Sequence, residues 1–163
     1  MLLVIAAAFS SILMVIHIGF RAPRRREKGS PADFGLTYRE ICIRTFEGKR
    51  LYAWWLWASS ISPTIILIHG WGGNAEYMLP LAVPFQNAGL NVLLLDARNH
   101  GRSDTASFSS LPRFAEDVSS AISWVKMQNE EQGGTIALLG HSVGAGAVLY
   151  EASRRVDISA VIS

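Results

Sequence analysis

The sequence Thr-Ile-Ala-Leu-Leu-Gly-His-Ser-Val-Gly-Ala-Gly-Ala, residues 135–147, predicts a strand, a sharp turn and the start of a helix. Its first five residues form a short apolar run, which is typical of a strand buried on both faces of a sheet. The next five residues, Gly140 to Gly144, fit the pattern Gly-x-Ser-x-Gly. The two glycines leave room for a strained turn that exposes the hydroxyl of Ser142 at the N-terminus of the helix. The stretch therefore predicts Ser142 as a nucleophile.

The rest of the chain shows the same alternation of buried strands and helices. Short apolar runs predict further strands at residues 64–68, 91–95 and 158–162. Helices are expected at residues 79–88, 111–129 and 143–155. Before them, residues 39–46 and 51–58 predict an antiparallel hairpin. This order predicts an α/β fold, with an N-terminal hairpin, a mostly parallel sheet and flanking helices.

A glycine-rich loop, His69-Gly-Trp-Gly-Gly73, directly follows the strand at 64–68. A loop of this kind can turn backbone N–H groups toward Ser142, and acyl transfer needs two such donors for the oxyanion. We assign these donors to the N–H groups of Trp71 and Val143. A phosphate-binding loop is the alternative, but the sequence lacks both the Walker lysine and the Gly-x-Gly-x-x-Gly spacing.

The segment Asp96-Ala-Arg-Asn-His-Gly-Arg-Ser103 follows the strand at 91–95. With the two other motifs, it resembles the α/β-hydrolase superfamily, in particular its monoglyceride-lipase-like and serine-aminopeptidase-like branch. There the corresponding segment is Asp-x-Arg-Gly-His-Gly-x-Ser, so Asn99 stands where that pattern has glycine. The resemblance covers residues 36–163 and implies that Ser142 is the nucleophile. It also implies structural roles in this loop for Asp96, Arg98, His100 and Ser103.

The resemblance also implies a base and an acid that follow the serine along the chain. None of the four histidines is a credible base, because all of them precede Ser142: His17, His69, His100 and His141. We expect His69 and His100 to hold loops, and the side chain of His141 to point elsewhere. Glu151 and Asp157 follow the serine, but on a helix and a turn rather than at the family's acid position. The sequence thus predicts a hydrolase domain truncated after its sixth strand, before the strands that carry the acid and the histidine.

Two classes of function follow from this pattern. The first is a serine hydrolase that cleaves an ester, thioester or amide through an acyl-enzyme on Ser142, with the complete protein supplying the acid and the histidine. An acyltransferase on the same scaffold is a variant of it. The second is an inactive remnant or a membrane-tethered interaction domain. Nothing in the sequence indicates a metal or an organic cofactor, and the expected partner is a small molecule or peptide that carries an acyl group.

The N-terminal segment differs from the rest in composition. Residues 1–20 are mostly apolar and uncharged, which predicts a transmembrane anchor; a cleaved signal peptide is the alternative. Residues 21–28 carry a net charge of +4, so the remaining residues sum to −2 and give no electrostatic footprint for nucleic-acid binding. The basic cluster predicts that the domain lies on the cytoplasmic side. We expect residues 21–35 to be a basic flank and linker, and residues 36–163 a partial hydrolase domain.

Overall fold

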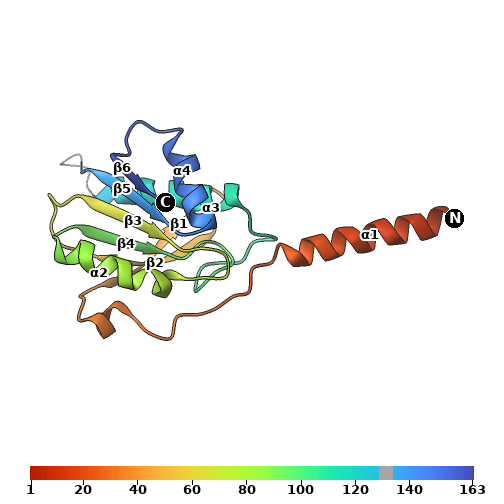
Figure 1. Cartoon of the computed structure of the whole chain (residues 1–163), viewed down its shortest axis with the longest axis horizontal. Helices are drawn as coiled ribbons and strands as arrows, with labels where there is room; N and C mark the ends of the chain where they lie inside the picture. Colours follow the sequence, from red (N-terminus) through yellow and green to blue (C-terminus); the bar gives the residue numbers. More distant parts are fainter. Residues whose placement is uncertain (129–133) are drawn as a thin grey trace.

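The computed structural model of the chain describes residues 1–128 and 134–163. Within them, six strands form one sheet in the order β1-β2-β4-β3-β5-β6 (Figure 1). The strands are β1 Arg39–Arg44, β2 Arg50–Leu56, β3 Thr64–Ile68, β4 Asn91–Leu95, β5 Ile136–Gly140 and β6 Ala160–Ile162. β2 pairs antiparallel with β1 and β4, whereas β4, β3, β5 and β6 run parallel. The predicted hairpin and mostly parallel sheet are confirmed.

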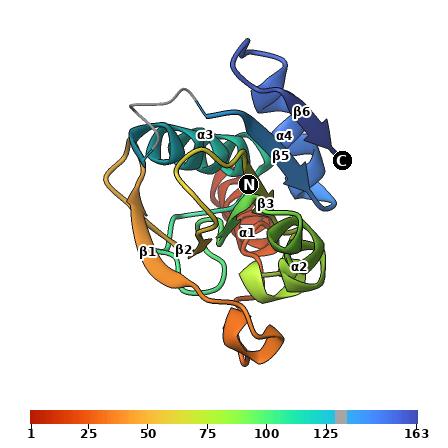
Figure 2. The ribbon, with the colours of Figure 1, turned by 90° about the vertical axis from the view of Figure 1, so that its left-hand side faces the viewer.

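Helices cover both faces of this sheet (Figure 2). The longer helices are α1 Leu2–Gly19, α2 Leu79–Asn87, α3 Leu111–Gln128 and α4 Val143–Ala152, and two short 3-10 helices are η1 Pro31–Phe34 and η2 Ala75–Met78. Helices α3 and α4 pack on one face, and η2 and α2 on the other. Alternate residues of β3 therefore enter different cores: Ile66 and Ile68 face α3 and α4, while Ile65 and Leu67 face α2. Burial on both faces explains why the strand is continuously apolar.

The observed boundaries lie close to the predicted ones, with a few shifts. Gly89 has φ +83° directly after the end of α2, as expected for a glycine that ends a helix. Helix α4 ends at Ala152, three residues before the predicted end, because the chain tightens there: the N–H of Arg155 donates to the carbonyl of Ala152. The predicted helix at 111–129 is confirmed to Gln128, and Asn129 lies outside the described residues.

Helix α1 projects away from the domain, and none of its residues is buried (Figure 1). It is long and apolar enough to cross a membrane, although a signal sequence has the same properties. The next segment differs from its prediction as a linker, because residues 31–34 form η1. The N–H of Ser30 donates to the carboxylate of Asp33 at 2.8 Å and stabilises the start of this helix.

Candidate active site

Ser142 lies in the turn between β5 and α4, at the carboxyl edge of the parallel strands. Its φ of 55° and ψ of −120° are unusual for a residue with a side chain and place its backbone under strain. The flanking N–H of His141 donates to the carbonyl of Ile68 at 3.1 Å, and that of Gly144 donates to the carbonyl of His141 at 2.9 Å. The first bond fixes the turn to β3 and the second closes the turn itself, while Ser142 remains exposed.

Both glycines of the turn are required by close packing. A Cβ at Gly140 would lie 2.2 Å from the carbonyl oxygen of Gly144, and one at Gly144 would lie 2.5 Å from that of His69. Neither oxygen can move freely, because each belongs to the backbone. The Gly-x-Ser-x-Gly spacing is thus a steric requirement of the turn.

The glycine-rich loop after β3 passes directly over this turn. A Cβ at Gly70 would lie only 3.0 Å from the Cβ of Ser142. Gly72 has φ +69°, and the N–H of Gly73 donates to the carbonyl of Gly70 at 3.1 Å, which closes the loop into a tight turn. Trp71 and Ser142 consequently line one cavity of about 380 Å³. Val143, the second proposed donor, is the first residue of α4, so its N–H has no partner within the helix.

The two buried histidines join the loops beneath this cavity. Nδ1 of His69 lies 2.7 Å from the carbonyl oxygen of Gly70, and its Nε2 accepts the N–H of Ala97 at 3.1 Å. Nδ1 therefore carries the proton, and burial lowers the pKa of His69 to about 3. Nδ1 of His100 lies 2.8 Å from the carbonyl oxygen of Arg98, and burial also lowers the pKa of His100. Both side chains hold loops, as the sequence predicts.

His141 differs from its prediction. Its side chain lines the same cavity as Ser142 instead of pointing away from it, because the glycine-rich loop folds back over both residues. Its Nδ1 faces Gly70, at 3.0 Å from where a Cβ would stand. No hydrogen bond joins His141 to Ser142 among the described residues, so the geometry of a nucleophile–base pair is not formed by this histidine.

The loop after β4 is organised around Asp96 and Ser103. The carboxylate of Asp96 accepts the N–H of Ala75 at 2.7 Å and that of Arg102 at 2.8 Å. The hydroxyl of Ser103 donates to the carbonyl of Asp96 at 2.7 Å and accepts the N–H of Tyr52 at 2.8 Å. These bonds connect the loop after β4 to β2 and η2 and hold it in place.

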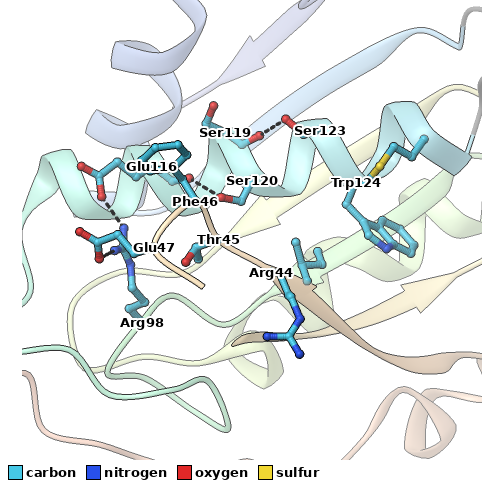
Figure 3. A pocket seen from close by; sticks show the side chains of 12 residues that line it. Arg44, Thr45, Phe46, Glu47, Arg98, Glu116, Ser119, Ser120, Ser123 and Trp124 are labelled. Carbon is cyan, nitrogen blue, oxygen red and sulfur yellow. Dashed lines mark hydrogen bonds and ion pairs between the residues drawn. The ribbon is translucent and has the colours of Figure 1, made fainter. Parts of the chain in front are cut away.

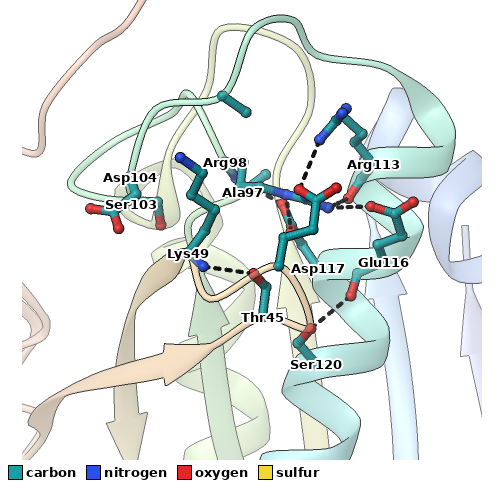
Figure 4. A network of polar contacts seen from close by, with 12 residues as sticks. Thr45, Lys49, Ala97, Arg98, Ser103, Asp104, Arg113, Glu116, Asp117 and Ser120 are labelled. Carbon is teal, nitrogen blue, oxygen red and sulfur yellow. Dashed lines mark hydrogen bonds and ion pairs between the residues drawn. The ribbon is translucent and has the colours of Figure 1, made fainter.

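Arg98 fixes the same loop to two other elements through charge (Figure 4). Its guanidinium is almost fully buried and contacts Asp117 of α3 at 2.6 Å, Glu116 of α3 at 2.5 Å and Glu47 of the hairpin turn at 2.8 Å. Burial raises the pKa of Asp117 to about 7, although the charge of Arg98 opposes the rise. The network is structural, since the cavity of Ser142 is lined by other residues.

Asn99, which replaces the glycine of the family pattern, has φ +68°. Asparagine tolerates this left-handed conformation better than most residues do, so the departure keeps the backbone of the pattern. The Asn99 amide also donates to the hydroxyl of Ser109 at 3.1 Å and accepts the N–H of Ala106 at 2.6 Å. The substitution therefore adds two bonds that glycine cannot make.

A larger cavity, of about 780 Å³, lies between the hairpin and α3 (Figure 3). Two of its serine hydroxyls donate to carbonyls of their own helix: Ser120 to Glu116 at 2.9 Å and Ser123 to Ser119 at 3.0 Å. It contains none of the predicted site residues except Arg98, which is bound by carboxylates. The smaller cavity at Ser142 is accordingly the candidate active site.

The sheet order, the strained serine turn after β5 and the glycine-rich loop after β3 define an α/β hydrolase. Among solved structures, the chain is similar to the Pyrococcus furiosus esterase Pf2001, with a TM-score of 0.79 and 25% identity over 87% of this chain and 54% of that one. The sequence of residues 59–163 matches the serine aminopeptidase S33 family. The chain belongs to this family of hydrolases.

The chain is also similar to longer curated proteins. The polyketide transferase ATR5 of Stachybotrys chlorohalonatus is 29% identical over 131 residues, covering 78% of this chain and 44% of the relative. The thiohydrolase aneE of Aspergillus aculeatus is 28% identical over 130 residues, covering 76% of this chain and 41% of the relative. The chain thus spans less than half the length of these relatives.

One group of cavity residues is not predicted by the sequence. Pro23 and Arg25, from the basic flank, line the cavity of Ser142 together with Tyr77 and Leu81. No local pattern identifies them, because they reach the cavity only through the path of the folded chain.

Proposed function

We propose that the protein is a serine hydrolase that cleaves an ester, thioester or amide through an acyl-enzyme on Ser142. The single observation that carries this proposal is the strained backbone of Ser142, which is held beside a glycine-rich loop in a shared cavity. Strain of this kind persists only where surrounding contacts enforce it, and it is common at active sites. The names of the relatives favour ester and thioester substrates.

In this mechanism the Ser142 hydroxyl attacks the acyl carbonyl and forms a tetrahedral intermediate. The N–H groups of Trp71 and Val143 stabilise its oxyanion, and the N-terminus of α4 favours the negative charge. The leaving group departs with a proton, and water then hydrolyses the acyl-enzyme. We propose that the base and its orienting acid lie in a region of the complete protein that corresponds to the unmatched part of the longer relatives.

A fluorophosphonate probe tests the assignment. It is applied to a form of the protein that also contains the region corresponding to the unmatched part of the relatives. We expect Ser142 to be labelled and Ser142→Ala to lose labelling. Ser153→Ala is the matched control, because Ser153 lies at the other end of α4 and its hydroxyl donates to the carbonyl of Tyr150. Equal labelling of Ser142→Ala would refute the proposal.

The second candidate function is a catalytically inactive, membrane-tethered interaction domain. It is favoured by the engagement of His69 and His100 in loop contacts, which leaves no paired base for Ser142 in the described residues. Loss of a base typically lowers turnover by about 10⁴ to 10⁶. Robust hydrolysis by the 163-residue chain, abolished by Ser142→Ala, would exclude this candidate.

The location is part of the proposal. We infer that α1 is a single-pass anchor and that the basic cluster keeps the domain on the cytoplasmic side. A protease added to sealed vesicles with the cytoplasmic face outward is then expected to degrade the domain. Protection of the domain in such vesicles would contradict this orientation.

A further inference from the structure

The segment that joins α1 to η1 is folded onto the hydrolase domain, and we name residues 20–29 the strap. In Figure 1 the chain leaves α1 at the side to which the parallel strands point and continues along the domain to η1. The carbonyl of Phe20 accepts the N–H of Ser109 at 3.0 Å, so contact begins directly after α1. The strap is therefore part of the domain surface around Ser142.

Polar contacts hold the strap along most of its length. The guanidinium of Arg24 donates to the carbonyls of Gly101 and Ser103 at 3.1 and 2.7 Å. The N–H groups of Lys28 and Gly29 donate to the carboxylate of Glu76 at 2.9 and 3.2 Å. These contacts hold the strap on both sides of Arg25.

The middle of the strap forms one wall of the Ser142 cavity. Pro23 packs so closely on Gly72 that a Cβ at this glycine would lie 3.1 Å from its ring. The carbonyl of Arg25 accepts a hydrogen bond from the side chain of Asn74 at 3.1 Å. The Arg25 side chain is thereby placed at the cavity, where its guanidinium donates to the hydroxyl of Tyr77 at 3.1 Å.

A second cavity, of about 660 Å³, adjoins the first, and Arg25 and Tyr77 line both of them. Arg26 and Lys28 also line the second cavity, and none of these three cations forms an ion pair with a described residue. Among the described residues Glu76 is the one acid on its wall, and its carboxylate accepts the backbone N–H groups of the strap. The second cavity thus offers positive charge and unused N–H donors.

We propose that the strap makes an anion-binding subsite, in which Arg25, Arg26 and Lys28 bind a phosphate group of the acyl substrate beside Ser142. Guanidinium groups match the oxygens of a phosphate in a bidentate geometry. The first cavity has apolar walls from Trp71, Met78 and Leu81, which suit the acyl chain. The substrate class is a phosphate-bearing acyl compound, and this assignment rests on the proposed hydrolase function. Binding of the anion itself requires no chemistry at Ser142.

Calorimetric titration of the 163-residue chain in phosphatidylcholine nanodiscs tests the subsite, with hexyl phosphate as the probe and hexanol as its neutral match. We expect hexyl phosphate to bind more tightly than hexanol. Arg25→Gln should weaken hexyl phosphate about tenfold and leave hexanol unchanged, because a charged hydrogen bond to the phosphate is lost. Arg25→Lys should retain part of the affinity and shows that the strap still folds.

Arg21→Gln is the matched control, since it removes the same charge from the strap at a residue outside both cavities. We expect it to change the affinity less than twofold. An equal loss in Arg21→Gln and Arg25→Gln would overturn the proposal in favour of diffuse attraction, and equal binding of hexanol and hexyl phosphate would overturn it as well. Ser142→Ala should bind hexyl phosphate normally, so a failure of the proposed hydrolase function is distinguishable from a failure of the subsite.

The phosphate has two sources, a soluble compound or a lipid headgroup. Nanodiscs that contain phosphatidate separate them. Competition with hexyl phosphate that depends on Arg25 supports the subsite and identifies a lipid source. Binding of hexyl phosphate that phosphatidate does not affect supports the subsite and identifies a soluble source.

Discussion

The nucleophile turn at residues 140–144 and the strap at residues 20–29 meet at the same cavity, but different forces hold them there. The turn is fixed by backbone packing so close that two of its positions exclude a side chain. The strap is fixed mainly by polar contacts to carbonyls and a carboxylate. A single added carbon atom disrupts close packing, whereas the strength of polar contacts changes with charge and pH.

One site can therefore combine a part that does not depend on pH with a part that does. The turn positions the proposed nucleophile whatever the solution conditions are, because steric exclusion has no titratable group. The strap carries Glu27, whose carboxylate lies against Asp96 beneath the cavity. Burial, and then the neighbouring Glu27, raise the pKa of Asp96. The contact between the strap and the domain therefore depends on whether the Asp96 carboxyl carries a proton.

The largest expected effect is at the turn. Gly140→Ala places a carbon 2.2 Å from the carbonyl oxygen of Gly144 and should reduce the free energy of unfolding by about 3 kcal/mol or more. Chemical denaturation in neutral detergent measures it. Gly146→Ala is the control in the adjoining helix α4, because the nearest neighbour of a Cβ there is the movable end of the Leu111 side chain. A loss of stability in Gly140→Ala no larger than in the control would contradict the steric account.

A smaller effect of opposite sign is expected at the serine itself. Ser142→Gly should be more stable than Ser142→Ala by about 1 kcal/mol, because glycine adopts the backbone angles of this turn without strain. Both variants lack the hydroxyl, so the comparison isolates the effect of the backbone conformation. Thermal unfolding of the two proteins side by side measures the difference, and equal midpoints would show that the turn stores no strain.

The smallest effect is expected in the strap and depends on pH. Because folding raises the pKa of Asp96, this carboxyl contributes stability that is fully present below its ordinary pKa of 3.8 and is lost as the pH rises through the raised value. One proton changes the free energy of unfolding by at most about 1.4 kcal/mol per pH unit. Glu27→Gln removes the second carboxylate, the one that raises the pKa of Asp96, so stability should fall over a narrower pH range above 3.8.

Glu40→Gln provides the control for this measurement. The hydrogen bond from Arg102 lowers the pKa of Glu40, so its contribution is lost only as the pH falls. Above the ordinary Glu40 pKa of 4.5, the pH dependence of stability should therefore match that of the unmodified chain. If the pH dependence of stability in Glu27→Gln also matched that of the unmodified chain, Glu27 would not raise the pKa of Asp96, and the link between the strap and this proton would be refuted.

Much of the fold was predictable because its determinants are local. The apolar runs that became β3, β4 and β5 are bounded by turns, and the face of α3 repeats with helical spacing. The orientation of His141 was not predictable. It depends on where the glycine-rich loop folds, and that loop is about 70 residues away along the chain.

The sequence alone determined the strands, the helices and the turn that presents Ser142, because hydrophobic periodicity and the steric freedom of glycine act over a few neighbouring residues. Tertiary contacts, in contrast, make a basic segment that was expected to be a flank and linker into a wall of the cavity. Its contacts join Arg24 and Arg25 to loops about 50 to 80 residues further along. Such pairings depend on the path of the whole chain, which no local pattern encodes.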